Sequence, residues 1–132
     1  MDWKIDKRWQ EKTYYTEQVF NNCTYHLELF IIERYKSNVY WVRLSSGKKR
    51  KEIDVFDIKD KKSVGGVKAL FWAREALYNF IDTHKFKSKK NLICIAWADN
   101  RRRNIYEKYL PDFKYESIEG IKVLVKRVCN KN

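Results

Sequence analysis

Residues 91–110 read NLICIAWADNRRRNIYEKYL, and the interpretation of the whole chain depends on this stretch. It opens with an apolar run from Leu92 to Ala98, which has the length of a buried strand. Asp99 and Asn100 follow, and both residue types are favoured as helix N-caps. Apolar and aromatic side chains then recur at helical spacing: Ile105, Tyr106, Tyr109 and Leu110. The pattern predicts a buried strand that turns sharply into a short helix over 100–110.

The turn of this strand–helix unit carries three consecutive arginines, Arg101, Arg102 and Arg103. Exposed cations at a helix N-terminus are destabilising by about 0.3–1 kcal/mol each. A local rule broken three times in a row suggests that an anion binds at this turn. A solvated run of charge is the alternative explanation.

A longer helix is predicted over 66–84, and it follows a basic, glycine-containing loop at 59–66. Its apolar side chains form one stripe that would pack on a sheet: Val67, Leu70, Phe71, Leu77, Phe80 and Ile81. The Gly65-Gly66 step enters the helix after several lysines. Such a step is a candidate phosphate cradle, although an ordinary turn before a helix has the same sequence.

The remaining segments have the alternation or the bounding turns of β-strands. Strands are predicted at 13–21, 24–35, 39–45, 51–58, 113–118 and 121–129. The last two are joined at Glu119-Gly120, a hairpin signal. Residues 1–12 are predicted to be an N-terminal arm or a short helix. The apolar phase shifts after Val55, which predicts a β-bulge between Val55 and Phe56 or a strand buried on both faces.

Together these elements predict one domain, 1–132, of the α/β (α+β) class. The expected architecture is a single mixed, mostly antiparallel, bent sheet with two main helices. The expected order of elements is β-β-β-β-α-β-α-β-β. His26, within the strand 24–35, is interpreted as a half-exposed strand histidine rather than as a catalyst.

The charge of the chain points to an anionic partner. There are 29 basic and 17 acidic residues, and the formal net charge is +12. This balance favours binding to nucleic acid, a phosphorylated cofactor or an acidic protein, and it does not choose among them. The composition, rich in Lys, Asn, Tyr and Ile, fits a gene of low GC content, for example from a phage.

The cysteines and the hydropathy pattern suggest a cytoplasmic location. Cys23, Cys94 and Cys129 are far apart, and no metal-ligand spacing or disulfide framework is present, so free thiols in a reducing compartment are expected. The N-terminus has no apolar signal core, and no run is long enough to span a membrane.

The element order and the last 40 residues resemble the GNAT superfamily of acyl-CoA-dependent N-acetyltransferases. The final strand–helix unit of that family commonly has Asn, then Tyr-Glu-Lys seven residues later, then Gly-Phe. Here Asp99 takes the Asn position, Tyr106-Glu107-Lys108 matches, and Phe113 approximates the Phe, whereas the Gly is missing and Pro111-Asp112 lengthens the junction.

The cofactor loop of the family reads Q/R-x-x-G-x-G/A before its long helix. The corresponding residues here are Lys62-Ser63-Val64-Gly65-Gly66-Val67. Lys62 and Gly65 are in place, and Val67 stands where the last Gly or Ala belongs. These departures are those of a degenerate, phage-type member of the family.

The resemblance implies acetyl-CoA (or CoA) as cofactor and transfer of an acetyl group to an amine. The pyrophosphate would lie on the amides of Ser63 to Val67. The bulged strand, at Phe56 and Ile58, would face the pantetheine arm, and a backbone N–H near Val55 or Phe56 would stabilise the oxyanion. The further cofactor-binding residues would be Lys62, Asp99, Arg101 and Arg103.

The resemblance also implies two catalytic roles. Tyr106 would protonate the departing thiolate, or else it is a core aromatic on a helix face. The general base would be Glu52, Asp54 or Glu28.

Two other functions remain open from the sequence. One is a non-catalytic basic protein on the same scaffold, which contacts nucleic acid or a host protein through its basic loops and aromatic side chains. The other is a metal-dependent nuclease, because Asp57-Ile58-Lys59 mimics a D-x-K strand motif, although the upstream acid and first helix that such an enzyme needs are absent.

Overall fold

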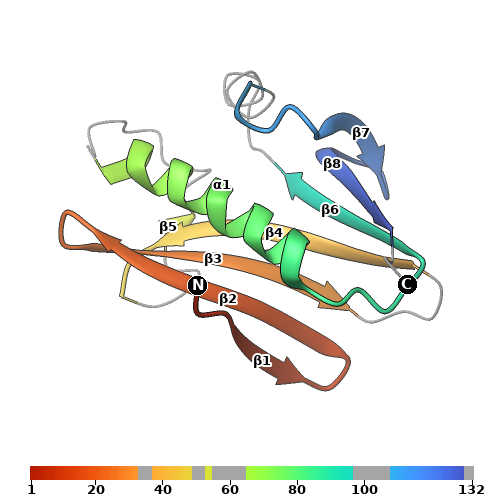
Figure 1. The fold of residues 1–132 in the computed structure, drawn as a ribbon, viewed down its shortest axis with the longest axis horizontal. Helices are drawn as coiled ribbons and strands as arrows, with labels where there is room; N and C mark the ends of the chain where they lie inside the picture. The colour runs from red at the N-terminus through yellow and green to blue at the C-terminus, as the bar shows by residue number, and fades with distance from the viewer. Residues whose placement is uncertain (33–36, 49–52, 55–64, 97–107, 130–132) are drawn as a thin grey trace.

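The structure is a computed structural model that describes residues 1–32, 37–48, 53–54, 65–96 and 108–129 (Figure 1). These residues form one helix and eight strands. In chain order the elements are β1 (Lys4–Arg8), β2 (Glu11–Phe20), β3 (Cys23–Ile32), β4 (Ser37–Ser46), β5 (Ile53–Asp54), α1 (Gly65–Thr83), β6 (Lys90–Ala96), β7 (Lys114–Ile118) and β8 (Ile121–Cys129).

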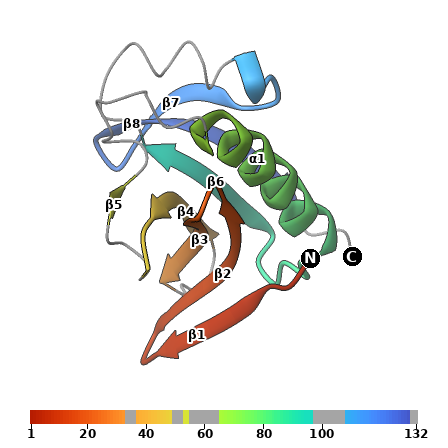
Figure 2. The same ribbon diagram turned by 90° about the vertical axis from the view of Figure 1, so that its left-hand side faces the viewer.

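The strands form one mixed sheet in the order β1-β2-β3-β4-β6-β8-β7, and β5 pairs with β4 off this path. Every neighbouring pair is antiparallel except β4 and β6, which are parallel from Ser37 opposite Lys90 to Val42 opposite Ile95. Parallel neighbours need a crossover connection, and α1 supplies it. Figure 2 shows α1 lying along one face of the sheet.

Two tight turns fix the register of the hairpins. Asn21 and Asn22, between β2 and β3, have φ of 49° and 62°, and Glu119 and Gly120, between β7 and β8, have φ of 53° and 81°. Positive φ at both central residues is the turn geometry whose twist matches that of paired strands. The hairpin predicted at Glu119-Gly120 is therefore confirmed.

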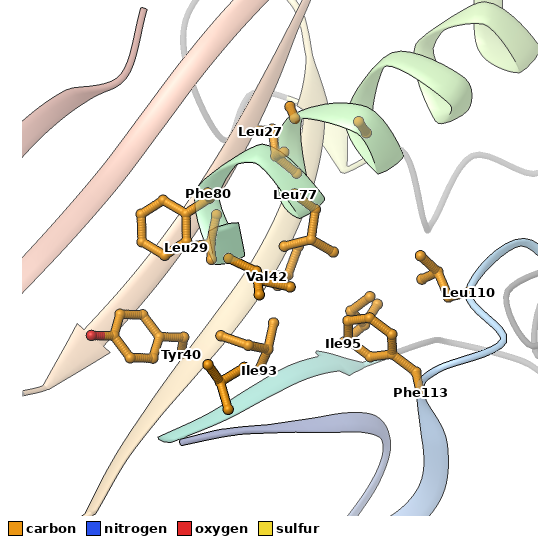
Figure 3. Close-up of a cluster of buried hydrophobic side chains, with 14 of the residues drawn as sticks. Leu27, Leu29, Tyr40, Val42, Leu77, Phe80, Ile93, Ile95, Leu110 and Phe113 are labelled. Carbon is orange, nitrogen blue, oxygen red and sulfur yellow. The ribbon is translucent and has the colours of Figure 1, made fainter. Parts of the chain in front are cut away.

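The main core lies between α1 and the face of the sheet that it covers (Figure 3). From α1 it takes Leu77, Phe80 and Ile81, and from the sheet mainly Leu27, Leu29, Tyr40, Val42, Leu44, Ile93, Ile95 and Leu124. Alternate residues of a strand share a face, so Leu27, Leu29 and Ile31 of β3 all point into this core. Each fully buried Leu or Ile contributes about 1.5–3 kcal/mol.

The helix predicted over 66–84 is confirmed, but its buried stripe differs from the prediction. Phe71, expected on the stripe, is 46% exposed. The sheet-facing positions in the first half of α1 are alanines instead: Ala69, Ala73 and Ala76. Small side chains let the helix approach the sheet closely. The predicted stripe contains only the large apolar residues and so leaves the alanines out.

The predicted α/β class with two main helices in GNAT-like order is wrong. The described residues are mostly β, and α1 is the one helix whose full extent lies within the described ranges. The expected helix at 100–110 falls largely on residues that the structure does not describe, and of its described part only Lys108 and Tyr109 are helical.

The prediction for the N-terminal segment, residues 1–12, is also wrong. Residues 1–12 are neither an arm nor a helix, because Lys4–Arg8 form β1, which pairs with β2 from Lys4 opposite Tyr15 to Arg8 opposite Glu11. Trp3 precedes this strand and packs on the core, with its indole N–H donating to Asn79 Oδ1 at 3.1 Å. Burial of this tryptophan is what places the segment on the edge of β2.

A cluster of aromatic side chains packs around His84, just after the C-terminal end of α1. The His84 ring stacks on Phe80 at 4.5 Å between centroids and is approached edge-on by Tyr14 and Phe86, each at 4.8 Å. Burial lowers the pKa of His84 below its ordinary value of 6.5, and the charges of Lys12 and Lys87 lower it further. His84 is therefore held neutral in the folded protein, where the Tyr40 hydroxyl lies 3.3 Å from its Nε2.

The three cysteines are free thiols in different environments: Cys23 is half-buried, Cys94 is buried and Cys129 is exposed. Burial, together with the nearby charges of Glu116 and Glu119, raises the pKa of Cys94 to about 12. Among the described residues, no helix combines the length and apolarity needed to cross a membrane.

We expect two phenylalanines of α1 to differ strongly in their contribution to stability. Phe80→Ala should lower the free energy of unfolding by about 3–5 kcal/mol, the usual cost of deleting a buried phenyl ring. Phe71→Ala is the matched control on the same helix, and it should cost about 1 kcal/mol, because it loses only the edge contact with Tyr109. Urea unfolding measures both values. Equal losses would show that the buried face of α1 is wrongly assigned.

We also expect His84 to make the protein less stable in acid. Its folded pKa lies below its unfolded pKa, so the unfolded chain binds more protons as the pH falls through 6.5. This contribution to stability is complete above pH 6.5, decreases as the pH falls toward the folded pKa, and is constant below it. Urea unfolding between pH 7.5 and 5 should show a smaller decrease for His84→Gln than for the parent protein. Identical pH dependence would contradict the assignment.

Candidate functional site

The parallel strands β4 and β6 part at their carboxyl ends. Over the described residues, which leave out 97–107, they pair as far as Val42 opposite Ile95, and β4 continues to Ser46. One edge of β4 is paired with β3 from Tyr40 to Ser46. β5 pairs with β4 at Ser45 and Ser46, so it must use the other edge, which is the edge that β6 uses. Arg43 and Leu44 lie between, where no described strand pairs with that edge. We call this separation of β4 from β6 the fork.

The N-terminus of α1 lies at the same end of the sheet as the fork. Figure 1 shows the arrowheads of β4 and β6 pointing toward the end at which α1 begins. The first turn of α1 starts with Gly65 and Gly66 and contains no acidic residue. The free N–H groups of a helix N-terminus and the helix dipole favour an anion there. Ligands of open sheets commonly bind outside the carboxyl ends of parallel strands.

A group of polar side chains lies on the face of the sheet that α1 does not cover. We call it the polar patch; it comprises Glu17, His26, Glu28, Arg43 and Ser45. The strand register places Glu17, His26 and Ser45 side by side across three strands, and Glu28 directly opposite Arg43 in the next row. Residues in these two rows share one face because they are two positions apart along each strand.

His26 is the best-defined member of the polar patch. It is 2% exposed, and its Nε2 lies 2.8 Å from the carbonyl oxygen of Gly47. A carbonyl only accepts, so Nε2 carries a hydrogen and donates it. The Gly47 N–H in turn donates to the Thr24 carbonyl at 2.9 Å. His26 therefore anchors the turn after β4, in which Gly47 has φ of 124°.

The other ring nitrogen of His26 faces a carboxylate. Nδ1 lies 3.2 Å from Oε2 of Glu17, which is close enough for an ion pair but lacks the direction of a hydrogen bond. A protonated imidazole is attracted to this carboxylate, whereas the lone pair of a neutral one would be repelled by it. The prediction of a half-exposed His26 is wrong, because the turn and β4 cover it.

Glu28, one of the three predicted general bases, is also deeply buried. It is 1% exposed, and it lies opposite Arg43, which is at the fork. A carboxylate is rarely buried so completely unless a cation or hydrogen-bond donors accompany it. Of the other two predicted bases, Asp54 takes the register position opposite Ser45 in the adjoining row, and Glu52 lies outside the described residues.

Most of the predicted cofactor loop and the second predicted helix lie outside the described residues. This applies to Phe56, Ile58, Lys62, Ser63, Val64, Asp99, Arg101, Arg103 and Tyr106, and to the predicted bulge after Val55. Gly65, Gly66 and Val67 form the start of α1, as expected from the sequence. The structure thus puts Asp54 and the start of α1 at the same end of the sheet, and Glu28 nearer the middle of β3, on the face that α1 does not cover.

Sequence reasoning missed Arg43, Glu17 and Ser45 as members of the site. The available signal was in the strand 24–35, where His26 and Glu28 occupy alternate positions opposite a fully apolar face. Their cross-strand neighbours depend on register, which the local sequence does not specify. In the described part of the chain, no three His, Cys, Asp or Glu side chains are grouped in a way that could hold a metal ion.

A separate hollow of about 390 Å³ lies beside the edge of β2. It is lined by Met1, Asp2, Lys4, Tyr15, Thr16, Glu17, Gln18 and Trp72. Its lining includes Glu17 of the polar patch, and we assign it no function.

Comparison of the chain with protein-family models, with curated proteins and with solved structures finds no match.

We expect His26 to stabilise the turn at Gly47 measurably. His26→Ala removes the donor to a carbonyl and leaves a buried space, so it should lower the free energy of unfolding by about 1–3 kcal/mol. Glu17→Gln, at the half-exposed end of the same contact, should cost at most about 1 kcal/mol. Urea unfolding of both variants at neutral pH gives the comparison. A His26→Ala protein as stable as the parent would exclude this anchoring role.

Proposed function

We propose that the protein is an N-acyltransferase that transfers an acetyl group from acetyl-CoA to an amine. The observation that carries this proposal is the fork: two parallel strands separate at their carboxyl ends, next to the start of α1 and to a buried carboxylate. A long substrate with a phosphorylated end and a reactive end fits this arrangement, because anion binding and acid–base chemistry are both available there.

The N-terminus of α1 would bind the pyrophosphate of acetyl-CoA. Gly65 and Gly66 have no side chains, so the phosphate oxygens can approach the backbone N–H groups closely. The absence of acidic residues in the first turn leaves the positive end of the helix dipole uncompensated. The extended pantetheine arm would then lie in the fork, beside Arg43 and Leu44.

Glu28 is the described residue best placed to act as the general base. It would accept a proton from the ammonium form of the acceptor, directly or through one water. The amine nitrogen would then form a bond to the thioester carbon as the carbon–sulfur bond breaks. Tyr106, predicted from the sequence alone, would give its proton to the departing thiolate, and the second proton of the nitrogen would pass to the resulting tyrosinate, which leaves a neutral amide.

The net charge of +12 also supports a second candidate, a non-catalytic protein that binds nucleic acid or an acidic protein. The two functions differ in whether acetyl-CoA is bound and its thioester consumed. The proposed acyltransferase would work in the cytoplasm, where acyl-CoA is available and where free thiols such as Cys23 and Cys129 remain reduced.

Charge at the start of α1 should control acetyl-CoA binding. The double variant Gly65→Asp/Gly66→Asp should bind acetyl-CoA at least about 10-fold more weakly, because two carboxylates would face the pyrophosphate. The same variant should be no less stable to heat, since Asp is favourable in the first turn of a helix. Titration calorimetry gives the affinity, and a thermal melt excludes unfolding as the cause.

The matched control is Gly65→Asn/Gly66→Asn, which has the same shape without the charge and should lose much less affinity. Release of free CoA thiol in the presence of a panel of amines then separates an acyltransferase from a protein that only binds CoA. The proposal fails if the parent protein does not bind acetyl-CoA, or if it binds but releases no thiol with any amine.

A further inference from the structure

The end of the sheet opposite the fork carries a concentration of cations, which we call the basic end. It is formed by the β1–β2 hairpin and by the connection from α1 to β6. Its cations are Lys7, Arg8 and Lys12 from the hairpin and Lys85, Lys87, Lys89 and Lys90 from the connection. Figure 1 shows the β1–β2 turn, the last turn of α1 and the start of β6 toward the same end of the sheet, and Figure 2 shows the tip of the hairpin standing away from the other two.

The hairpin and the connection are in contact at one point. The Tyr14 ring of β2 lies 4.8 Å from the His84 ring, which begins the connection. The charges of Lys12 and Lys87 both lower the pKa of His84, so both cations lie near this ring. The connection is fixed in turn to β4, because Asn38 Nδ2 donates to the Ser88 hydroxyl at 2.9 Å.

Few acidic side chains offset these cations. The hairpin contains Asp6, Glu11 and Glu17, of which Glu17 belongs to the polar patch, and Asp82 lies near the end of α1. Asp6 lies 3.7 Å from Arg8. All the cations of the basic end are exposed except Lys12, which is half-buried. A cluster of exposed cations repels itself, and a polyanion that spans the cluster removes this repulsion.

The exposure of Trp9, at the tip of the hairpin, is independent evidence for a ligand at the basic end. Its side chain is 97% exposed, the largest value among the exposed large apolar residues of the described chain. Its φ is 53°, in the left-handed region, which costs a non-glycine residue roughly 1–2 kcal/mol. The β7–β8 turn has Glu119 at the same φ, so it is the exposure of the indole, rather than the backbone conformation, that sets Trp9 apart.

We propose that the basic end binds single-stranded nucleic acid, with a base stacked on Trp9 and phosphates along the lysines. Proteins that bind single strands without sequence preference combine a cationic track with exposed aromatic rings. Trp9 follows Arg8 at the tip of the hairpin, and the lysines at 85–90 follow His84, which contacts the hairpin at Tyr14. A single strand that reaches from the tip to the connection would meet both.

Other anionic partners fit the basic end less well. A membrane surface would require more apolar area, whereas near Trp9 the other exposed large apolar residues of the described chain are only Ile5 and Ile32, 52% and 41% exposed. The bases of a duplex are stacked on each other and offer no face to Trp9. An acidic protein would use the lysines but would leave no specific role for the indole.

Fluorescence anisotropy with a labelled 20-nucleotide oligo-dT tests the proposal on the full chain. Trp9→Ala should weaken binding about 5- to 150-fold, the range found when an aromatic that stacks on a base is removed. Trp9→Phe should restore most of the affinity, because a phenyl ring also stacks. Thermal melts of both variants should match the parent, since Trp9 is almost fully exposed.

The lysines are tested with two triple variants of equal charge. Lys85→Gln/Lys89→Gln/Lys90→Gln should weaken binding and flatten its salt dependence by up to about two units of slope, at about 0.7 per phosphate contact. Lys48→Gln/Lys68→Gln/Lys122→Gln removes the same charge near the fork and should change both much less. Acetyl-CoA binding should be unaffected by the first triple variant, so this proposal and the proposed function can fail separately.

Several outcomes would overturn the proposal. Absence of oligo-dT binding would do so, as would an unchanged affinity of Trp9→Ala or an equal effect of the two triple variants. Tighter binding to the duplex of the same length would assign the surface to double-stranded nucleic acid. Binding only to vesicles of phosphatidylserine and phosphatidylcholine, or only to an acidic peptide, would assign it to those partners instead.

Discussion

The packing of α1 on the sheet is the interaction on which the rest of the structure depends. β4 and β6 are parallel neighbours, so the chain must return from one end of the sheet to the other between them. α1 makes this return across one face, and Leu77 and Phe80 pack on residues of β3, β4 and β6. The antiparallel hairpins on either side of this unit could form locally. α1 joins β1–β4 to β6–β8 through the main core.

The direction of α1 gives the two ends of the molecule different chemistry. Its N-terminus, with Gly65 and Gly66, lies at the fork, where the helix dipole favours an anion. Its C-terminus lies at the basic end, where the same dipole stabilises nearby cations such as Lys85 and Lys87. The helix dipole therefore accounts for part of the charge distribution, and it does not account for the exposed Trp9.

The polar patch exists because one helix covers only one face of the sheet. On the opposite face, apolar side chains such as Val123 and Val125 fill the half near β8, and His26 and Glu28 occupy the half near β2. Burial of these two groups is costly unless it is compensated. Glu28 lies opposite Arg43 at the fork, where the proposed function puts the thioester.

The sequence by itself determined the local elements. Alternation in 24–35 identified β3, apolar spacing and length identified α1 and β6, and Glu119-Gly120 identified the last hairpin, because all these signals act within a few residues. It did not determine that Lys4–Arg8 would be a strand, since that follows from burial of Trp3 on α1. It also did not determine that alanines rather than Phe71 would face the sheet, or that Arg43 would lie opposite Glu28. Helix approach and strand register are set by contacts between residues far apart in the chain, so only the tertiary structure decided the class of the fold and which predicted site residues meet.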